Sequence, residues 1–211
     1  MAASTEPRFL LVEDEPLVAY SLLRMLKLRL KGHGKFVVAG TVREALAILK
    51  DDHDWTAFII DIGLPDGCGL DVLAYARLNC PTTPALILSG RLDEELVNRT
   101  YELRGLYTCK PASAARLAQF LDDAASSSMR LERALAAWTA RYGLLPSHVD
   151  VLRRAALGKT RKAIAAARGT SEETIKKQVH VLLGRTADPS LLDAIARLLR
   201  ESEHLFSPNT P

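Results

Sequence analysis

The stretch Phe58-Ile59-Ile60-Asp61-Ile62-Gly63-Leu64-Pro65-Asp66-Gly67 decides the fold. Its first three residues are apolar, as in a buried parallel strand, and its last five are rich in turn formers. Asp61 lies where strand and loop meet, and a charge held there is costly unless another group interacts with it. An isolated Asp after a strand often does no more than cap a turn, so its role depends on the rest of the sequence.

Four other short apolar runs lie within residues 1–125, and helical patterns alternate with them. The five strands are expected at 9–12, 36–39, 55–60, 84–88 and 105–109. Apolar residues with helical spacing follow each strand, at about 16–31, 41–49, 70–76, 93–103 and 117–121. Thr41 and Glu44 form a candidate capping box. Five strand–helix units predict an α/β fold with a doubly wound parallel sheet, whose ligand site lies beyond the carboxyl ends of the strands.

Reactive side chains occur just past the ends of four of these strands. They are Glu13 with Asp14, Asp61, Ser89 and Lys110. Three converging carboxylates repel one another unless a cation is present, and Mg²⁺ prefers oxygen ligands of this kind. An amine and a hydroxyl are suited to phosphate oxygens, and a carboxylate can act as a nucleophile that forms an acyl phosphate.

Taken in order, these motifs resemble the receiver domain of bacterial two-component response regulators. The resemblance covers residues 8–125 and rests on Val12-Glu13-Asp14-Glu15-Pro16, Ile60-Asp61-Ile62-Gly63-Leu64-Pro65, Gly69, Leu88-Ser89-Gly90 and Tyr107-Thr108-Cys109-Lys110-Pro111. It implies a flavodoxin-like sheet that receives a phosphoryl signal from a sensor histidine kinase or a phosphotransfer protein.

The resemblance also implies a role for each site residue. Asp61 would be the phosphoacceptor, Ser89 the switch hydroxyl, and Lys110 the partner of the phosphoryl group. The Mg²⁺ ligands would be Glu13, Asp14, Asp61 and the backbone carbonyl of Gly63. Tyr107 matches the aromatic switch position, although a strand Tyr can equally well be a packing residue.

Two enzyme classes are alternatives to this interpretation. Phosphatases with an aspartate nucleophile use a second acid two residues later, where this chain has Gly63. Gly158-Lys159-Thr160 resembles the end of a phosphate-binding P-loop, but the Gly required five residues before Gly158 is replaced by Arg153. We therefore expect a signalling protein that catalyses only its own phosphorylation and dephosphorylation.

Charge divides the chain into two parts with different expected partners. Residues 1–125 carry 14 Lys and Arg against 17 Asp and Glu, whereas residues 144–200 carry 11 against 5. The basic part favours an anionic polymer. The three cysteines are scattered, and neither a secretory signal nor an apolar stretch of about 20 residues is found. We expect a cytoplasmic protein without a membrane partner.

We divide the chain into a receiver domain (1–125), a helical linker (126–145), a helix-turn-helix domain (146–201) and a flexible tail (202–211). The run Ser126-Ser127-Ser128 is expected to interrupt the helical pattern. The linker then carries one apolar stripe, formed by Leu131, Leu135, Trp138 and Tyr142. This stripe either docks on a neighbouring part of the chain or pairs with a second copy.

The basic part is predicted to be a small all-α domain. Its first three helices have Ser147, Thr160 and Thr170-Ser171 as candidate caps, and the fourth runs from about Pro189 to Arg200. Two short helices joined by a Gly-containing turn, with basic residues on the second, are what a helix-turn-helix needs to enter the major groove.

The segment from Leu157 to Val179 is similar to the LuxR-type helix-turn-helix, and the resemblance covers about residues 144–200. It departs at Gln178, where the family usually has His, and at the opening of the first helix. The DNA-binding residues that the charge and the resemblance indicate are Lys159, Arg161, Lys162, Thr174, Lys176, Lys177, Gln178 and His180.

We expect a transcription regulator that binds promoter DNA, forms a homodimer on activation and is controlled by phosphorylation. The apolar residues of the fourth helix are candidates for the dimer face, with core packing as the other explanation. Two alternatives stay open: an output that acts through protein contacts, and a receiver that works without phosphorylation.

Overall fold

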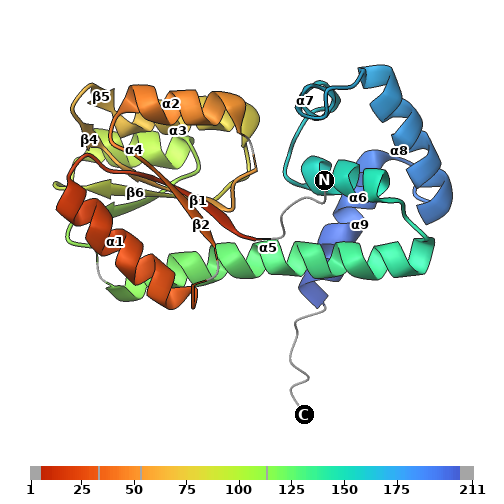
Figure 1. Cartoon of the computed structure of the whole chain (residues 1–211), viewed down its shortest axis with the longest axis horizontal. Coiled ribbons are helices and arrows are strands. Elements are labelled where there is room, and N and C mark those ends of the chain that lie inside the picture. Colours follow the sequence, from red (N-terminus) through yellow and green to blue (C-terminus); the bar gives the residue numbers. More distant parts are fainter. Residues whose placement is uncertain (1–5, 33, 53, 113, 205–211) are drawn as a thin grey trace, which may run out of the picture. The chain divides into compact units, whose positions relative to one another are not determined.

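The computed structural model describes residues 6–32, 34–52, 54–112 and 114–204 (Figure 1). Contacts divide the chain into two compact units, one formed by Glu6–Ala125 and the other beginning at Ser126. Each unit has its own apolar core and is described separately below.

The first unit is built on a parallel sheet of five strands. The strands are β1 (Arg8–Val12), β2 (Lys35–Ala39), β3 (Ala57–Asp61), β6 (Ala85–Ser89) and β7 (Leu106–Cys109). Their order is β2-β1-β3-β6-β7, and every neighbouring pair is parallel. The predicted doubly wound five-stranded sheet is confirmed, and its strand order is that of flavodoxin-like folds.

Helices cover both faces of this sheet (Figure 1). They are α1 (Pro16–Arg29), α2 (Val42–Asp51), α3 (Gly69–Asn79), α4 (Glu94–Glu102) and the first part of α5 (Ala114–Tyr142). Side chains alternate along each strand, so Phe9, Leu11 and Ile59 pack in one core with residues of α1 and α5. Leu10 and Ile60 pack in the other core with residues of α2 and α3.

A short hairpin follows β3 that the sequence did not predict. It consists of β4 (Gly63–Leu64) and β5 (Gly67–Cys68), which pair antiparallel with Gly63 opposite Cys68. Pro65 stands at the second position of the four-residue turn and Gly67 at the fourth, as type I turns prefer. The segment after Asp61 is therefore a defined element rather than a loose loop.

The second unit consists of helices alone among its described residues. They are the part of α5 from residue 126 onward, α6 (Pro146–Ala156), α7 (Arg161–Ala167), α8 (Glu172–Thr186) and α9 (Leu191–His204). One core cluster joins Leu131, Leu135 and Trp138 of α5 to Leu152 of α6 and Leu182 of α8. The apolar stripe of residues 131–142 thus docks inside its own unit.

Arg197 strengthens this docking with polar contacts to α5. Its guanidinium donates to the hydroxyl of Tyr142, the last residue of α5, at 2.6 Å. It also donates to the carboxylate of Asp188, between α8 and α9, at 2.9 and 2.8 Å. It also lies 4.3 Å from the centre of the Trp138 ring, as in a cation–π contact. The Trp138 indole N–H donates to Glu201 at 2.7 Å. The C-terminal part of α5 and the middle and last part of α9 are therefore fixed to one another.

Two local predictions were wrong. Helix α5 continues through Ser126–Ser128, because a serine costs only about 0.5 kcal/mol of helix propensity and restarting a helix needs a new nucleus. Helix α6 has Leu145 rather than Ser147 as its N-cap. The Nδ1 atom of His148 accepts the Leu145 N–H at 3.3 Å in place of a serine cap.

The predicted flexible tail at 202–211 falls largely outside the described residues. Helix α9 extends to His204, and residues 205–211 lie beyond the part of the chain that the structure describes. Among the described helices, none combines the length and the apolar character needed to cross a membrane.

Candidate phosphoacceptor site and basic surface

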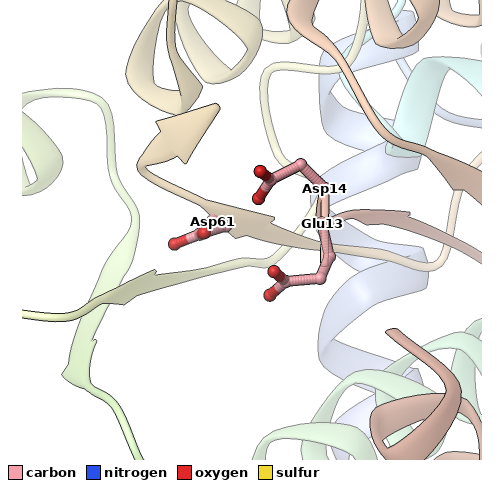
Figure 2. Close-up of side chains that lie close together, drawn as sticks. All are labelled: Glu13, Asp14 and Asp61. Carbon is pink, nitrogen blue, oxygen red and sulfur yellow. The ribbon is translucent and has the colours of Figure 1, made fainter. Parts of the chain in front are cut away.

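Three carboxylates lie together at the carboxyl edge of the sheet, where β1 and β3 end (Figure 2). One oxygen each from Glu13, Asp14 and Asp61 fall within 4.8 Å of one another. Glu13 and Asp61 are buried, whereas Asp14 is exposed. The fold therefore brings together the acids that the sequence placed at separate strand ends.

Lys110 joins two of these carboxylates. Its Nζ atom lies 2.8 Å from Glu13 Oε2 and 2.9 Å from Asp61 Oδ2. The lysine follows β7, whose neighbour β6 accepts the Lys110 backbone N–H at the Ser89 carbonyl, 2.6 Å away. This contact fixes the start of the lysine side chain, which reaches across the strand ends to the acids.

Burial and the contacts between Glu13 and Lys110 act in opposite directions on the pKa values of these two groups. Burial raises the pKa of the Glu13 carboxyl above its ordinary value, since the hydrogen bond from Lys110 opposes burial without cancelling it. Burial alone would lower the pKa of Lys110, but the hydrogen bonds to Glu13 and Asp61 outweigh it and raise that pKa. Lys110 contacts two of the three carboxylates, and three clustered oxygen donors suit a small hard cation such as Mg²⁺.

Two hydroxyls meet at one carbonyl oxygen beside this cluster. The buried Ser89 hydroxyl donates to the Arg91 carbonyl at 2.8 Å and accepts the Arg91 N–H at 3.2 Å. The half-buried Tyr107 donates its hydroxyl to the same Arg91 carbonyl. Ser89 and Tyr107 are therefore linked through the loop after β6, a connection that the sequence did not indicate.

Comparison with protein families identifies this unit. Residues 9–122, more than half of the chain, match the response regulator receiver domain. The chain belongs to the response regulator receiver family. Its receiver domain is a signalling phosphoacceptor domain rather than a classical enzyme.

Curated relatives match the chain over shorter stretches. The sensor protein TorS of Escherichia coli (strain K12) is 34% identical over 119 residues, which are 54% of this chain and 12% of TorS. The transcriptional regulatory protein KdpE of Mycobacterium tuberculosis (strain CDC 1551 / Oshkosh) is 33% identical over 84 residues, 40% of this chain and 35% of KdpE. The cell cycle transcriptional regulator CtrA of Caulobacter vibrioides (strain NA1000 / CB15N) is 32% identical over 94 residues, 44% of this chain and 39% of CtrA. The chain thus spans less than half the length of each of these relatives.

Solved structures support the receiver fold. A CheY-like receiver domain from Methanospirillum hungatei JF-1 has a TM-score of 0.54 at 21% identity and covers 59% of this chain and 98% of its own. A receiver domain from Clostridium thermocellum has a TM-score of 0.53 at 20% identity, with coverage of 59% and 98%. At this identity the likeness concerns the fold alone.

The second unit presents basic side chains on α7 and α8, the helices where the sequence predicted DNA contacts. Arg161 and Lys162 are exposed on α7, and Lys176, Lys177 and His180 are exposed on α8. The turn between α7 and α8 passes through Gly169 at φ +58°, a conformation that favours glycine. Thr160 and Ser171 cap the two helices with their hydroxyls, as predicted.

Three of the predicted DNA-binding residues are less exposed. Lys159 and Thr174 are half-buried, and the Thr174 hydroxyl bonds the Ser171 hydroxyl at 2.9 Å. Gln178 is also half-buried, and its side-chain oxygen accepts a 2.6 Å hydrogen bond from Arg168. Arg168 in turn lies 3.4 Å from Asp150 of α6. No local sequence pattern indicates these contacts among three helices, because the residues involved are far apart in the chain.

Proposed function

We propose that this protein is a phosphorylation-controlled response regulator of a two-component system. Asp61 accepts the phosphoryl group, and the C-terminal helical unit binds promoter DNA in the cytoplasm. The observation that carries the proposal is the contact of Lys110 with both Asp61 and Glu13 at the carboxyl edge of the sheet, within a domain of the receiver family.

The proposed reaction is a direct transfer to the Asp61 carboxylate. An Asp61 oxygen attacks the phosphorus of a phosphohistidine on a sensor kinase or a phosphotransfer protein. A new O–P bond forms, the N–P bond breaks, and the departing imidazole nitrogen keeps the electron pair. The product is an acyl phosphate on Asp61. The strand register supports a role for Ser89 in this step, because Asp61 pairs with Leu88, one residue before Ser89 on the neighbouring strand.

Lys110 and Ser89 have complementary roles in this proposal. Lys110 holds the Asp61 carboxylate in place before transfer and supplies positive charge to the phosphoryl oxygens afterwards. Ser89 exchanges its contact with the Arg91 carbonyl for a hydrogen bond to a phosphoryl oxygen. Because Tyr107 bonds the same carbonyl, this exchange reaches Tyr107 and the surface of the receiver domain.

Glu13, Asp14 and Asp61, with the Gly63 backbone carbonyl, are the proposed ligands of Mg²⁺. The acid cluster fits this ion because its oxygens lie close together and one of its members is exposed to solvent. Bound Mg²⁺ supplies the positive charge that lets a phosphoryl group approach a set of carboxylates.

Intact mass tests the phosphoacceptor role. The whole protein is incubated with MgCl₂ and a small acyl phosphate, and we expect the mass of one phosphoryl group to be added. Asp61→Asn should stay unmodified under the same conditions, since the amide cannot form the acyl phosphate. An unmodified wild-type protein would remove the switch and leave a phosphorylation-independent regulator.

The DNA-binding role is supported by the exposed cations on α7 and α8 and by relatives that are transcriptional regulators. We propose that α8 enters the major groove with Lys176, Lys177 and His180 toward the DNA. We also propose that this unit is a helix-turn-helix of the LuxR type and that the protein forms a homodimer on activation. Gln178 contributes to it only if Arg168 releases it on binding.

Binding to mixed-sequence DNA at increasing salt tests this role. We expect affinity at low salt that falls steeply as salt rises, because each neutralised phosphate releases a counterion. Absence of binding even at low salt would leave protein contact as the output.

A further inference from the structure

The carboxylate of Asp66 binds the N-terminus of a helix that lies far from it in the sequence. Its Oδ1 atom accepts the Val42 N–H at 2.7 Å, and its Oδ2 atom accepts the Arg43 N–H at 3.0 Å. These are the first two amides of α2, which have no partner within the helix. Thr41 caps the next amide, that of Glu44, at 3.1 Å. Asp66 and Thr41 therefore divide the capping of one helix between them.

Asp66 belongs to the β4–β5 hairpin, which begins two residues after Asp61. The hairpin is closed by the pair of Gly63 and Cys68, and the Gly69 N–H donates to the Ile62 carbonyl at 3.0 Å. Gly67 also lies against α2, because a Cβ atom built on it would be 3.2 Å from the Val42 side chain. The hairpin thus touches α2 through its turn and reaches the phosphoacceptor site through its base.

The segment that receives Asp66 also holds an acid of the site. The Glu13 N–H donates to the Ala39 carbonyl at 3.0 Å, and Ala39 ends β2 just before α2 begins. Residues 39–43 therefore anchor Glu13 on one side and the hairpin with Gly63 on the other. The distance between these two proposed Mg²⁺ ligands depends on how firmly the hairpin is docked.

We propose that Asp66 is a positioning residue for the phosphoacceptor site. By docking the hairpin on the N-terminus of α2, it fixes the Gly63 carbonyl relative to Glu13 and Asp61, and so sets the affinity for Mg²⁺. This inference rests on the proposed function and adds a residue that lies outside the acid cluster. Asp66 itself touches neither the phosphoryl group nor the ion.

Asp66→Ala and Thr41→Ala form a matched pair for the test. Each variant removes a side-chain cap from the same end of α2, but only Asp66→Ala releases the hairpin. Mg²⁺ binding to the unphosphorylated whole protein is measured by isothermal titration calorimetry. We expect Asp66→Ala to bind Mg²⁺ roughly 10-fold more weakly, as is typical when a group that orients a metal ligand is lost. Thr41→Ala should bind like the wild type, and Asp66→Asn, which keeps one acceptor oxygen, should fall between.

A second measurement separates this inference from the proposed function. The Mg²⁺ concentration for half-maximal phosphorylation by a small acyl phosphate should rise by a similar factor in Asp66→Ala, while the rate at saturating Mg²⁺ stays near that of the wild type. Equal Mg²⁺ affinity in Asp66→Ala and Thr41→Ala would overturn the positioning role. A wild type that binds no Mg²⁺ and takes no phosphoryl group would overturn the proposed function instead.

Discussion

Gly69→Ala should destabilise the receiver domain strongly, although the substitution adds only one methyl group. A Cβ atom at this position would lie 1.9 Å from the backbone oxygen of Asp61 and 2.8 Å from the side chain of Ile60. Ordinary contacts of this kind are about 3.4 Å or longer, so the Asp61 carbonyl or the start of α3 has to move by more than about 1 Å.

The expected change in the free energy of unfolding combines two destabilising effects and one stabilising effect. Overpacking a tight site costs about 1–3 kcal/mol, and this backbone clash belongs at the upper end. Loss of the hydrogen bond from the Gly69 N–H to Ile62 adds about 1 kcal/mol. Replacing a helical glycine by alanine stabilises the protein by about 0.5–1 kcal/mol, because it lowers the conformational entropy of the unfolded chain. We expect a net loss of about 3 kcal/mol in the free energy of unfolding of the receiver domain.

This loss can be measured in the receiver domain alone by unfolding the protein in urea and monitoring hydrogen–deuterium exchange in peptides within residues 57–73. Gly90→Ala is the matched control, because a Cβ atom there meets nothing within 4 Å. It should unfold at nearly the wild-type urea concentration. Equal midpoints for Gly69→Ala and Gly90→Ala would refute the reasoning from the close contact with Asp61. Slower phosphorylation of Gly69→Ala is also expected, since the displaced carbonyl belongs to the phosphoacceptor.

Three further predictions concern the C-terminal unit. Trp138→Ala should lower the free energy of unfolding of this unit by about 3–5 kcal/mol, because the buried indole packs in its core. Amide exchange in α8 should then be faster than in the wild type. Unchanged exchange there would mean that α5 is not part of this core. Burial alone would raise the pKa of Asp188, but the hydrogen bond from Arg197 outweighs burial and lowers that pKa below its ordinary value. The stabilising effect of Asp188 is therefore complete above the unfolded pKa and is lost as the pH falls through the folded pKa. Amide exchange of α9 in acid should therefore rise less steeply in Asp188→Asn than in the wild type, and identical slopes would contradict this. Replacing both Lys176 and Lys177 by Ala should reduce the salt dependence of DNA binding by about one counterion each, whereas Lys35→Ala in the receiver domain should leave it unchanged.

The order of strands and helices in the receiver domain could be predicted because its signals are local. Apolar runs such as residues 9–12 and the helical spacing after Pro16 depend only on near neighbours in the chain. The gathering of the site's side chains could also be predicted, since parallel strands bring their carboxyl ends to one edge. Glu13 directly follows β1, and Asp61 and Ser89 are the last residues of β3 and β6. The interruption expected at Ser126–Ser128 failed because a weak local preference was outweighed by the continuity of the helix.

The amino-acid sequence by itself determined the α/β class of the first unit, the five-stranded sheet and the residues that gather at its edge. Only the tertiary structure decided how they interact: Lys110 joins Glu13 to Asp61, Asp66 caps α2, and Arg168 holds Gln178. These contacts join residues that are 10 to 97 positions apart, and they form only when packing fixes the backbones and the rotamers on both sides. Sequence periodicity indicates which face of an element a residue occupies. A hydrogen bond between distant elements, in contrast, forms only when packing sets the donor–acceptor distance to within a few tenths of an ångström.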